Sequence, residues 1–279
     1  HDRAAAFRQC LTSTQPKHLD ALIELAARAY RRPLTKSEEQ DLRALYDRMR
    51  RQEMSHEEAF RLTLARVLVA PAFLYRVEQP VAGPKQGPVS DWELANRLSY
   101  FLWSSQPDEE LRRVAAAGKL RETETLEAQT RRMLRDPKVG RLATEFACQW
   151  LHIYEFDELD EKSERHFPSF TALRGDMYEE SIRFFTDLFQ NNGSVLDILD
   201  ADHTFLNEAL AKHYGIAGVT GPECRRVLGM KAISRGGILA QATTLAKQSG
   251  ASRTSPVLRG NWVSEVLLGE RLPRPPKGV

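Results

Sequence analysis

Apolar residues recur at helical spacing along almost all of this 279-residue chain, and the alternation that marks strands is hard to find. The clearest case is the segment 172–189, where Tyr178, Ile182, Phe185 and Phe189 share one helical face. An aromatic stripe of this kind is typical of a helix packed on a core. We therefore expect an all-α fold, an irregular multi-helix array of two to three packed helical subdomains.

Short polar signals mark where the helices begin. Thr35 with Glu38, and Ser55 with Glu58, have the spacing of capping boxes, in which two side chains satisfy free backbone N–H groups. Pro33 ends the helix before the first box, since proline removes a backbone donor. The predicted helices span about 18–31, 35–51, 55–70, 90–103, 123–134, 139–152, 172–189 and 204–213, the last one capped by Thr204 and closed by Gly215.

Proline and glycine clusters suggest the domain boundaries. The run from Pro80 to Pro88 is typical of a linker, and a glycine-rich stretch runs from Gly215 to Gly221. We expect a helical hairpin-rich N-terminal domain at 1–80, a central helical domain at 88–216 and a C-terminal helical domain, truncated, at 222–279. Because the chain begins at His1 and not at Met, we also expect it to be an internal piece of a longer protein.

Composition excludes several classes of protein. A net charge of +2 gives no broad basic field, so nucleic acid is not indicated as a partner. No apolar run approaches the length of a membrane span. Three widely separated cysteines, Cys10, Cys148 and Cys224, form neither a disulfide framework nor a zinc motif, and no Cys-x-x-Cys-His is present to attach a c-type haem. We therefore predict no cofactor and no metal ligand in this chain.

The most distinctive string is 253–262, Arg-Thr-Ser-Pro-Val-Leu-Arg-Gly-Asn-Trp. Ser255 or Thr254 can cap a helix whose first position is Pro256, and Gly269 can end it. The arginines of this helix start can bind an anion, or they can hold neighbouring carboxylates and carbonyls. The candidate ligand-binding residues of the string are Arg253, Thr254, Ser255, Arg259 and Trp262.

Two polar clusters precede this string. The run 155–164 holds six carboxylates but lacks the glycine and spacing of a calcium loop, so we interpret it as a solvated loop. Asp202, His203 and Asn207 lie in a second cluster and are further candidates for ligand binding. His203 and His213 are too far apart to share a helical face as metal ligands do. Asp202 or Thr204 can equally serve as a helix cap, and His213 as a charge at a helix C-terminus.

No complete catalytic motif is present. The chain has no Gly-x-Ser-x-Gly, no His-Glu-x-x-His, no phosphate-binding glycine loop and no dinucleotide fingerprint. A triad assembled from distant segments cannot be detected in one sequence. The catalytic residues are therefore unknown, and whether the chain is an enzyme is left open.

Four strings together resemble a known set of domains. They are 29–35 (Ala-Tyr-Arg-Arg-Pro-Leu-Thr), 98–108 (Leu-Ser-Tyr-Phe-Leu-Trp-Ser-Ser-Gln-Pro-Asp), Thr-Phe-Leu-Asn-Glu at 204–208 with His-Tyr-Gly at 213–215, and the string 253–262. In this order they resemble consecutive domains of unknown function of the PSD type, found in large secreted proteins of planctomycetes and related bacteria. Those proteins commonly carry a cytochrome c-like module as well.

The resemblance implies export to the periplasm, the cell surface or the medium, and a c-type haem in a neighbouring domain of the parent protein. It also implies that the partners are the upstream haem domain or other parent domains, with polysaccharide as a candidate ligand. Our leading hypothesis is a non-catalytic helical scaffold or interaction region. The alternatives are a redox or hydrolytic enzyme with a site near Asp202, His203 and 253–262, and a carbohydrate-binding module that uses exposed Trp92, Trp103, Trp150 or Trp262.

Overall fold

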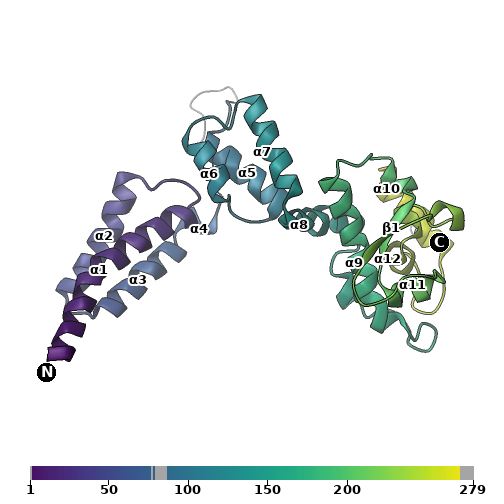
Figure 1. Cartoon of the computed structure of the whole chain (residues 1–279), viewed down its shortest axis with the longest axis horizontal. Coiled ribbons are helices and arrows are strands. Elements are labelled where there is room, and N and C mark those ends of the chain that lie inside the picture. Colours follow the sequence, from purple (N-terminus) through teal and green to yellow (C-terminus); the bar gives the residue numbers. More distant parts are fainter. Residues whose placement is uncertain (1, 77, 79–86, 271–279) are drawn as a thin grey trace, which may run out of the picture. The chain divides into compact units, whose positions relative to one another are not determined.

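The computed structural model describes residues 2–76, 78 and 87–270, with the side chains of 2–12 left out. It is mostly helical, as predicted, and contains one small two-stranded sheet (Figure 1). The chain forms two compact units. The N-terminal unit holds residues 1–100 and 105–126, and the C-terminal unit holds 101–104 and 127–279. The expected linker at 80–88 and the terminal prolines fall largely outside the described residues, and the predicted division into three domains stays a prediction.

Three helices that lie side by side begin the N-terminal unit (Figure 1). Both predicted capping boxes are present, since Thr35 and Ser55 accept from the backbone N–H of Glu38 and Glu58, whose carboxylates bond back to the caps. Buried side chains of all three helices, among them Leu22, form the core between them. The three are α1 (Asp2–Ala29), α2 (Lys36–Arg51) and α3 (His56–Leu68).

The rest of the N-terminal unit is also helical. Ser90 accepts from the backbone N–H of Glu93, and Asp108 accepts from that of Leu111, so that both side chains cap helices. Arg31, which has a positive φ of 60°, donates to the carbonyls of residues 72, 73 and 75 and so ties α4 to the end of α1. The elements are α4 (Pro71–Leu74), α5 (Asp91–Trp103), α6 (Glu109–Ala116) and α7 (Thr123–Arg135), of which α5 and α7 run on into the C-terminal unit.

The long helix α9 (Phe170–Gln190) is the centre of the C-terminal unit. Its aromatic stripe is core, as predicted, because Tyr178 and Phe185 are buried and Ile182 and Phe189 pack against the same cluster. Short elements surround it: η1 (Pro137–Val139), α8 (Gly140–Leu142), the π-helix η2 (Ala143–Cys148), η3 (Phe156–Glu158), α10 (Asp197–Asp200), η4 (Lys231–Ile233) and η5 (Ile238–Ala240).

A β-hairpin corrects the prediction at Thr204. Strand β1 (His203–Leu206) pairs antiparallel with β2 (Arg225–Leu228), with His203 opposite Leu228. Thr204 therefore caps no helix, and the following helix α11 (Glu208–Tyr214) is capped by Asn207, whose side chain accepts from the N–H of Leu210. Gly215, with a φ of 72°, closes α11 as predicted.

The distinctive string forms the last capped helix. Ser255 accepts from the N–H of Leu258 and Pro256 takes the first position of α13 (Pro256–Trp262), as predicted. The apolar side chains of this helix are only partly buried, because Val257 is 71% exposed while Trp262 is 5% exposed. Helix α12 (Ala242–Lys247) precedes α13, and the π-helix η6 (Val263–Leu267) follows it.

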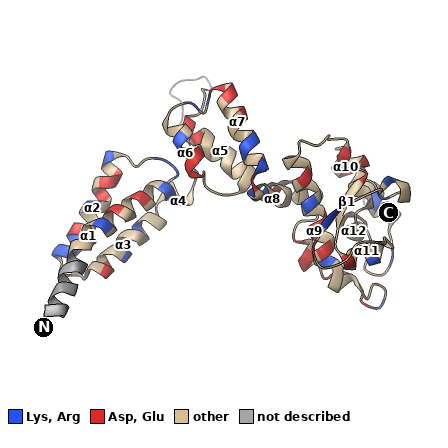
Figure 2. Cartoon of the chain, viewed as in Figure 1, with Lys and Arg blue, Asp and Glu red and all other residues tan. Residues whose placement is uncertain are grey.

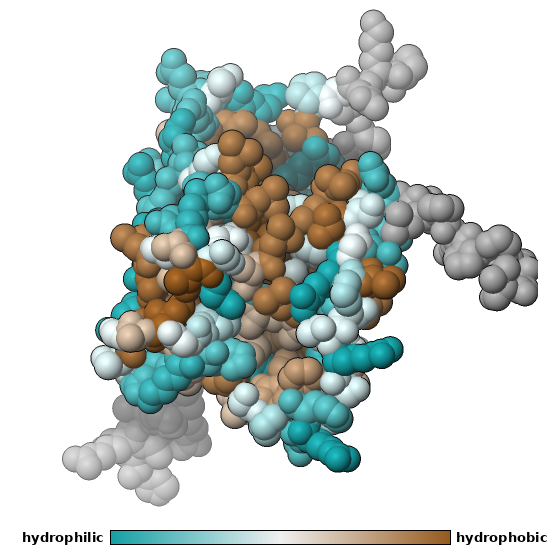
Figure 3. All heavy atoms as spheres, turned by 90° about the vertical axis from the view of Figure 1, so that its right-hand side faces the viewer, coloured by the Kyte–Doolittle hydropathy of each residue, from teal (hydrophilic) through white to brown (hydrophobic). Residues whose placement is uncertain are grey.

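The surface has no dominant sign of charge. Lys and Arg alternate with Asp and Glu along the helices (Figure 2), in keeping with a net charge of +2. Figure 3 shows apolar atoms standing among polar ones on one face, as expected when ordinary protein surface is largely apolar. Within the described part of the chain, no helix has the length and apolarity needed to cross a membrane.

Candidate functional site

A pocket of about 490 Å³ opens in the C-terminal unit, and we call it the basic pocket. Its cationic side chains come from distant segments: Lys162 from the loop before α9, Arg235 from the loop after η4 and Arg259 from α13. Among the described residues, no Asp or Glu lines it. The remaining walls are aromatic, apolar or neutral polar side chains with two histidines, including His166, Phe167, Phe170, Met177, His213, Tyr214, Leu245, Ser249 and Thr254.

Two of the three cations donate to backbone carbonyls. Lys162 donates to the carbonyl of Ser249 at 2.7 Å, and Arg235 donates to the carbonyl of Ala240 at 2.7 Å. The Nε of Arg259 is buried and has no hydrogen-bond partner among the described residues. Because no carboxylate of the described residues forms an ion pair with these three side chains, their positive charge is left for a ligand.

Burial shifts the titration of two groups that line the pocket. It lowers the pKa of Lys162, because removal of water disfavours the charged ammonium. It also lowers the pKa of His213, and the nearby charge of Arg235 adds to that effect. At pH 7 the neutral imidazole is therefore the main form of His213, and it can offer one donor and one acceptor.

A buried carboxyl group lies behind the pocket wall. Glu180 of α9 is 1% exposed and accepts two hydrogen bonds of 2.5 Å, from the hydroxyls of Thr204 and Tyr214. The Tyr214 hydroxyl in turn accepts from the N–H of Ala242 at 2.9 Å. The guanidinium of Arg235 lies over the Tyr214 ring, 3.6 Å from its centroid. Tyr214 thus connects the cation of the pocket with the carboxyl group of the core.

The state of Glu180 changes near neutral pH. Burial raises its pKa to about 7, against the lowering effect of the two hydroxyl donors and of Arg235. For Tyr214, burial and the neighbouring Glu180 hold the pKa well above its usual value, so that the phenol stays protonated. The pocket therefore gains a negative charge behind its wall as the pH rises through 7.

A second buried polar contact holds the same helix to the C-terminal segment. The hydroxyl of Ser181 donates to Oε1 of Gln241 at 2.8 Å and lies 2.7 Å from the hydroxyl of Thr243. All three residues are buried. Buried hydrogen bonds of this kind favour one packing arrangement, so this contact positions α12, and with it one wall of the pocket, against α9.

Of the candidate residues in the string 253–262, some line the basic pocket and others do not. Thr254 and Arg259 line the basic pocket. Arg253 is exposed and lies outside the lining, and Ser255 serves as the helix cap. Trp262 is buried, and its indole N–H donates to the carbonyl of Leu151 at 3.0 Å. Ligand binding by these residues stays a prediction, for which Thr254 and Arg259 have the suitable position.

The other three candidates lie outside the pocket. Asp202 accepts from the backbone N–H of Lys231, and Asn207 is the cap of α11. His203 lies between two partners: its Nε2 is 3.2 Å from Asp187, and its Nδ1 accepts from Arg226 at 3.2 Å. Burial and the charge of Arg226 lower the pKa of His203. Since both ring nitrogens are engaged, His203 fastens the hairpin to α9.

Sequence reasoning missed Lys162, Arg235, Tyr214 and Glu180 as parts of a site. Lys162 falls in the acidic run, where a single lysine carries no signal, and Glu180 falls in a helix with several other polar residues, from which the sequence does not single it out. The only available signal was the His-Tyr-Gly string at 213–215, which contains Tyr214.

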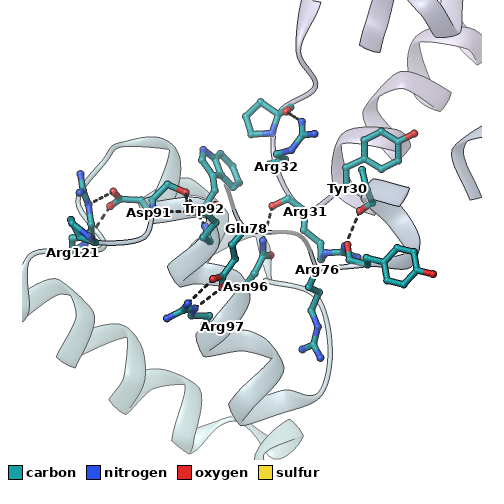
Figure 4. Close-up of a pocket in the computed structure, with 16 residues that line it drawn as sticks. Tyr30, Arg31, Arg32, Arg76, Glu78, Asp91, Trp92, Asn96, Arg97 and Arg121 are labelled. Carbon is teal, nitrogen blue, oxygen red and sulfur yellow. Dashed lines mark hydrogen bonds and ion pairs between the residues drawn. The ribbon is translucent and has the colours of Figure 1, made fainter. Parts of the chain in front are cut away.

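A larger pocket of about 930 Å³ lies in the N-terminal unit (Figure 4). Its arginines are bound within the protein: Arg97 pairs with Glu78 at 2.5 Å, Arg121 with Asp91 at 2.7 Å, and Arg76 lies over the ring of Tyr100. Figure 4 shows the first two pairs as dashed contacts. Because these charges are already matched, the basic pocket is the stronger candidate for a ligand site.

Metal ligands and aromatic surfaces give no stronger candidate. In the described ranges, no group of three or more His, Cys, Asp and Glu side chains is placed to hold a metal ion. Trp103 and Trp262 are buried, whereas Trp92 and Trp150 are half-buried and belong to different units. Cys148 is buried, and burial raises the pKa of its thiol to about 12, which keeps the thiol protonated.

Comparison with protein families divides the chain into three matched regions. Residues 18–78 match PSD5, described as a protein of unknown function (DUF1595), and residues 89–216 match PSD4, a protein of unknown function (DUF1592). Residues 235–279 match PSCyt3, a protein of unknown function (DUF1588), whose name suggests a cytochrome-associated domain. Searches of curated proteins and of solved structures found no match. Three regions of the chain thus match, in this order, the models of PSD5, PSD4 and PSCyt3, all described as proteins of unknown function.

Proposed function

We propose that this chain is a non-catalytic scaffold and interaction region of an exported multidomain protein, and that its C-terminal unit binds an anionic group in the basic pocket. The c-type haem of the parent protein lies in another domain. The partner is another domain of the parent or a polysaccharide, and the group that enters the pocket is a carboxylate, sulfate or phosphate.

The observation that carries this proposal is the set of cations without carboxylate partners. Lys162, Arg235 and Arg259 line one pocket, and no acidic residue in the described part of the chain lines it with them. An anion that enters replaces water around these cations and makes charge-assisted hydrogen bonds, which are stronger than neutral ones. Arg259, with a buried Nε that lacks a partner, gains most from such a ligand.

The walls and the size favour a particular kind of anion. Phe167, Phe170, Tyr214 and Leu245 give the pocket an apolar and aromatic lining. A volume of about 490 Å³ suits a ring-sized small molecule or the end of a longer chain. An anionic group attached to a ring, such as the carboxylate of a uronic acid, meets both requirements.

The groups near the pocket give little support to the enzyme alternative. Asp202 and His203 do not line the pocket that Thr254 and Arg259 line, so the two halves of the expected catalytic site do not face one cavity. The raised pKa of Tyr214 keeps its phenol protonated, so that it cannot accept a proton as a general base near neutral pH. Glu180 is enclosed in the core.

A thermal-shift screen tests the proposal. The chain is heated with glucuronate, sulfate or phosphate, and with glucose as the neutral control of the same size as glucuronate. An anion at about a hundred times its dissociation constant adds roughly 2.7 kcal/mol of stability. We expect a shift with at least one anion and none with glucose. Equal responses to glucuronate and glucose would rule out recognition of the charge, and no response to any anion would leave only the scaffold role.

A further inference from the structure

Two histidines of the N-terminal unit, one on each of two neighbouring helices, lie within hydrogen-bonding distance of each other. Nδ1 of His18, on α1, lies 3.1 Å from Nε2 of His56, at the start of α3. His18 is exposed and His56 is half-buried, so ions in solution can reach the gap between them. The pair lies in the N-terminal unit, whereas the basic pocket lies in the C-terminal unit, and it does not depend on the proposed function.

The distance between the two nitrogens allows both to bind one metal ion. A Zn²⁺ or Cu²⁺ ion binds imidazole nitrogen at about 2.0–2.1 Å, so nitrogens 3.1 Å apart subtend about 100° at a shared ion. This angle falls between those of square-planar and tetrahedral coordination. Imidazole is also a ligand that these two ions prefer.

A tyrosine on α2, the helix that carries neither histidine, contacts the pair. The hydroxyl of Tyr46, on α2, lies 2.7 Å from Nδ1 of His56, and Tyr46 is 7% exposed. Metal-bound histidines usually donate their second ring N–H to a carboxylate, a backbone carbonyl or water, which fixes the tautomer of the ring, and the hydroxyl oxygen of Tyr46 can accept in the same way. With Nδ1–H of His56 donated to Tyr46, the lone pair of Nε2 points toward His18.

From this geometry we propose that His18 and His56 form a two-histidine clip for a Zn²⁺ or Cu²⁺ ion, positioned by Tyr46 and completed by water. Binding exchanges the hydrogen bond between the rings for two nitrogen–metal bonds. Each ring stays neutral, with its remaining proton on the nitrogen that faces away from the metal, so no net proton is lost. Burial and the neighbouring His18 lower the pKa of His56, which favours the neutral ring that a metal requires. The ion then joins α1 to α3.

Copper binding to the full chain at pH 7.5 tests the clip. Calorimetry should show one Cu²⁺ per chain, bound more tightly than Zn²⁺ as the usual order of metal affinities requires. The electron paramagnetic resonance spectrum should carry the splitting of two nitrogen ligands. His18→Gln and His56→Gln should each weaken binding by more than the about tenfold loss typical of a supporting residue, and Tyr46→Phe by about tenfold.

The matched control is His152→Asn, because His152 is also exposed but lies in the C-terminal unit, and its positive φ of 59° suits asparagine. Circular dichroism checks that each variant keeps its helices. A test on the unaltered chain needs no variant: Zn²⁺ should protect His18 and His56 together from diethyl pyrocarbonate, as read by mass spectrometry. The absence of binding, full affinity in either glutamine variant, or protection of only one of the two rings would overturn the clip.

Discussion

The hydroxyl of Tyr214 lies 2.5 Å from Oε2 of Glu180, and the ring of the same tyrosine supports the guanidinium of Arg235 at the basic pocket. One side chain therefore touches both a carboxyl group of the core and a cation that faces the ligand. The protonation state of Glu180 and the charge of the pocket are linked through this contact, and a contribution to the pH dependence of stability follows from it.

Stability should fall as the pH rises toward 7, because of Glu180. The pKa of Glu180 is about 4.5 in the unfolded chain and is raised to about 7 in the folded chain. Well below pH 4.5 the carboxyl group is therefore protonated in both states. Between pH 4.5 and 7 the unfolded chain releases this proton while the folded chain keeps it. The free energy of unfolding therefore falls by about 3 kcal/mol by pH 7. Above pH 7 the contribution is constant.

Urea unfolding of the wild type and of Glu180→Gln between pH 4.5 and 8 measures this effect. Glutamine keeps the shape and an acceptor but cannot ionise. The stability of the wild type relative to the variant should therefore decline by about 3 kcal/mol across that range. Parallel curves for the two proteins would show that Glu180 titrates normally.

Removal of the Tyr214 hydroxyl should destabilise the C-terminal unit. Tyr214→Phe keeps the ring under Arg235 but removes the hydroxyl. Glu180 then loses one of its two hydroxyl donors, and the N–H of Ala242 loses its acceptor. Buried groups left without partners cost about 1–3 kcal/mol. The loss, measured by urea unfolding, should be greater at pH 8, where Glu180 is ionised, than at pH 5.

Tyr154→Phe is the matched control, since Tyr154 is 41% exposed and the change is the same. It should alter stability by no more than about 0.5 kcal/mol. If the two tyrosine variants lost equal stability at both pH values, the hydroxyl of Tyr214 would not hold a charged carboxylate.

Two glycines should respond differently to alanine. Gly215 and Gly237 both have positive φ, 72° and 66°. A methyl group at Gly215 meets nothing within 4 Å, so Gly215→Ala should cost only the backbone strain of about 1–2 kcal/mol. A methyl group at Gly237 overlaps the backbone of Leu199, so Gly237→Ala should cost clearly more. Thermal unfolding of the two variants compares them, and equal losses would contradict the close packing at Gly237.

Local features of the fold could be predicted from the sequence because they depend on residues close in the chain. Thr35 with Glu38 and Ser255 with Pro256 act within one helical turn, and both predictions are confirmed. The hairpin was missed because its strands have four residues each and a helix lies between them, so neither shows enough alternation. Thr204 in particular could be placed only by the pairing with Val227.

The site depends on contacts between distant segments, which one sequence does not encode locally. Thr254 and Arg259 were candidates because the string that contains them is distinctive, and both reach the basic pocket. Lys162 and Arg235 join them only after folding. Glu180 is preceded by a half-buried glutamate in a helix, and nothing in the pattern shows which of the two faces the core.

The central claim is that the basic pocket binds an anion through Arg259. Calorimetric titration with glucuronate should compare the wild type with Arg259→Gln and with Arg253→Gln, a control in the same string that lies outside the pocket. Loss of a charge-assisted hydrogen bond of about 1.5 kcal/mol should weaken binding about tenfold in Arg259→Gln. Arg253→Gln should bind as the wild type does. Equal weakening in both variants, or unchanged binding in Arg259→Gln, would contradict the account.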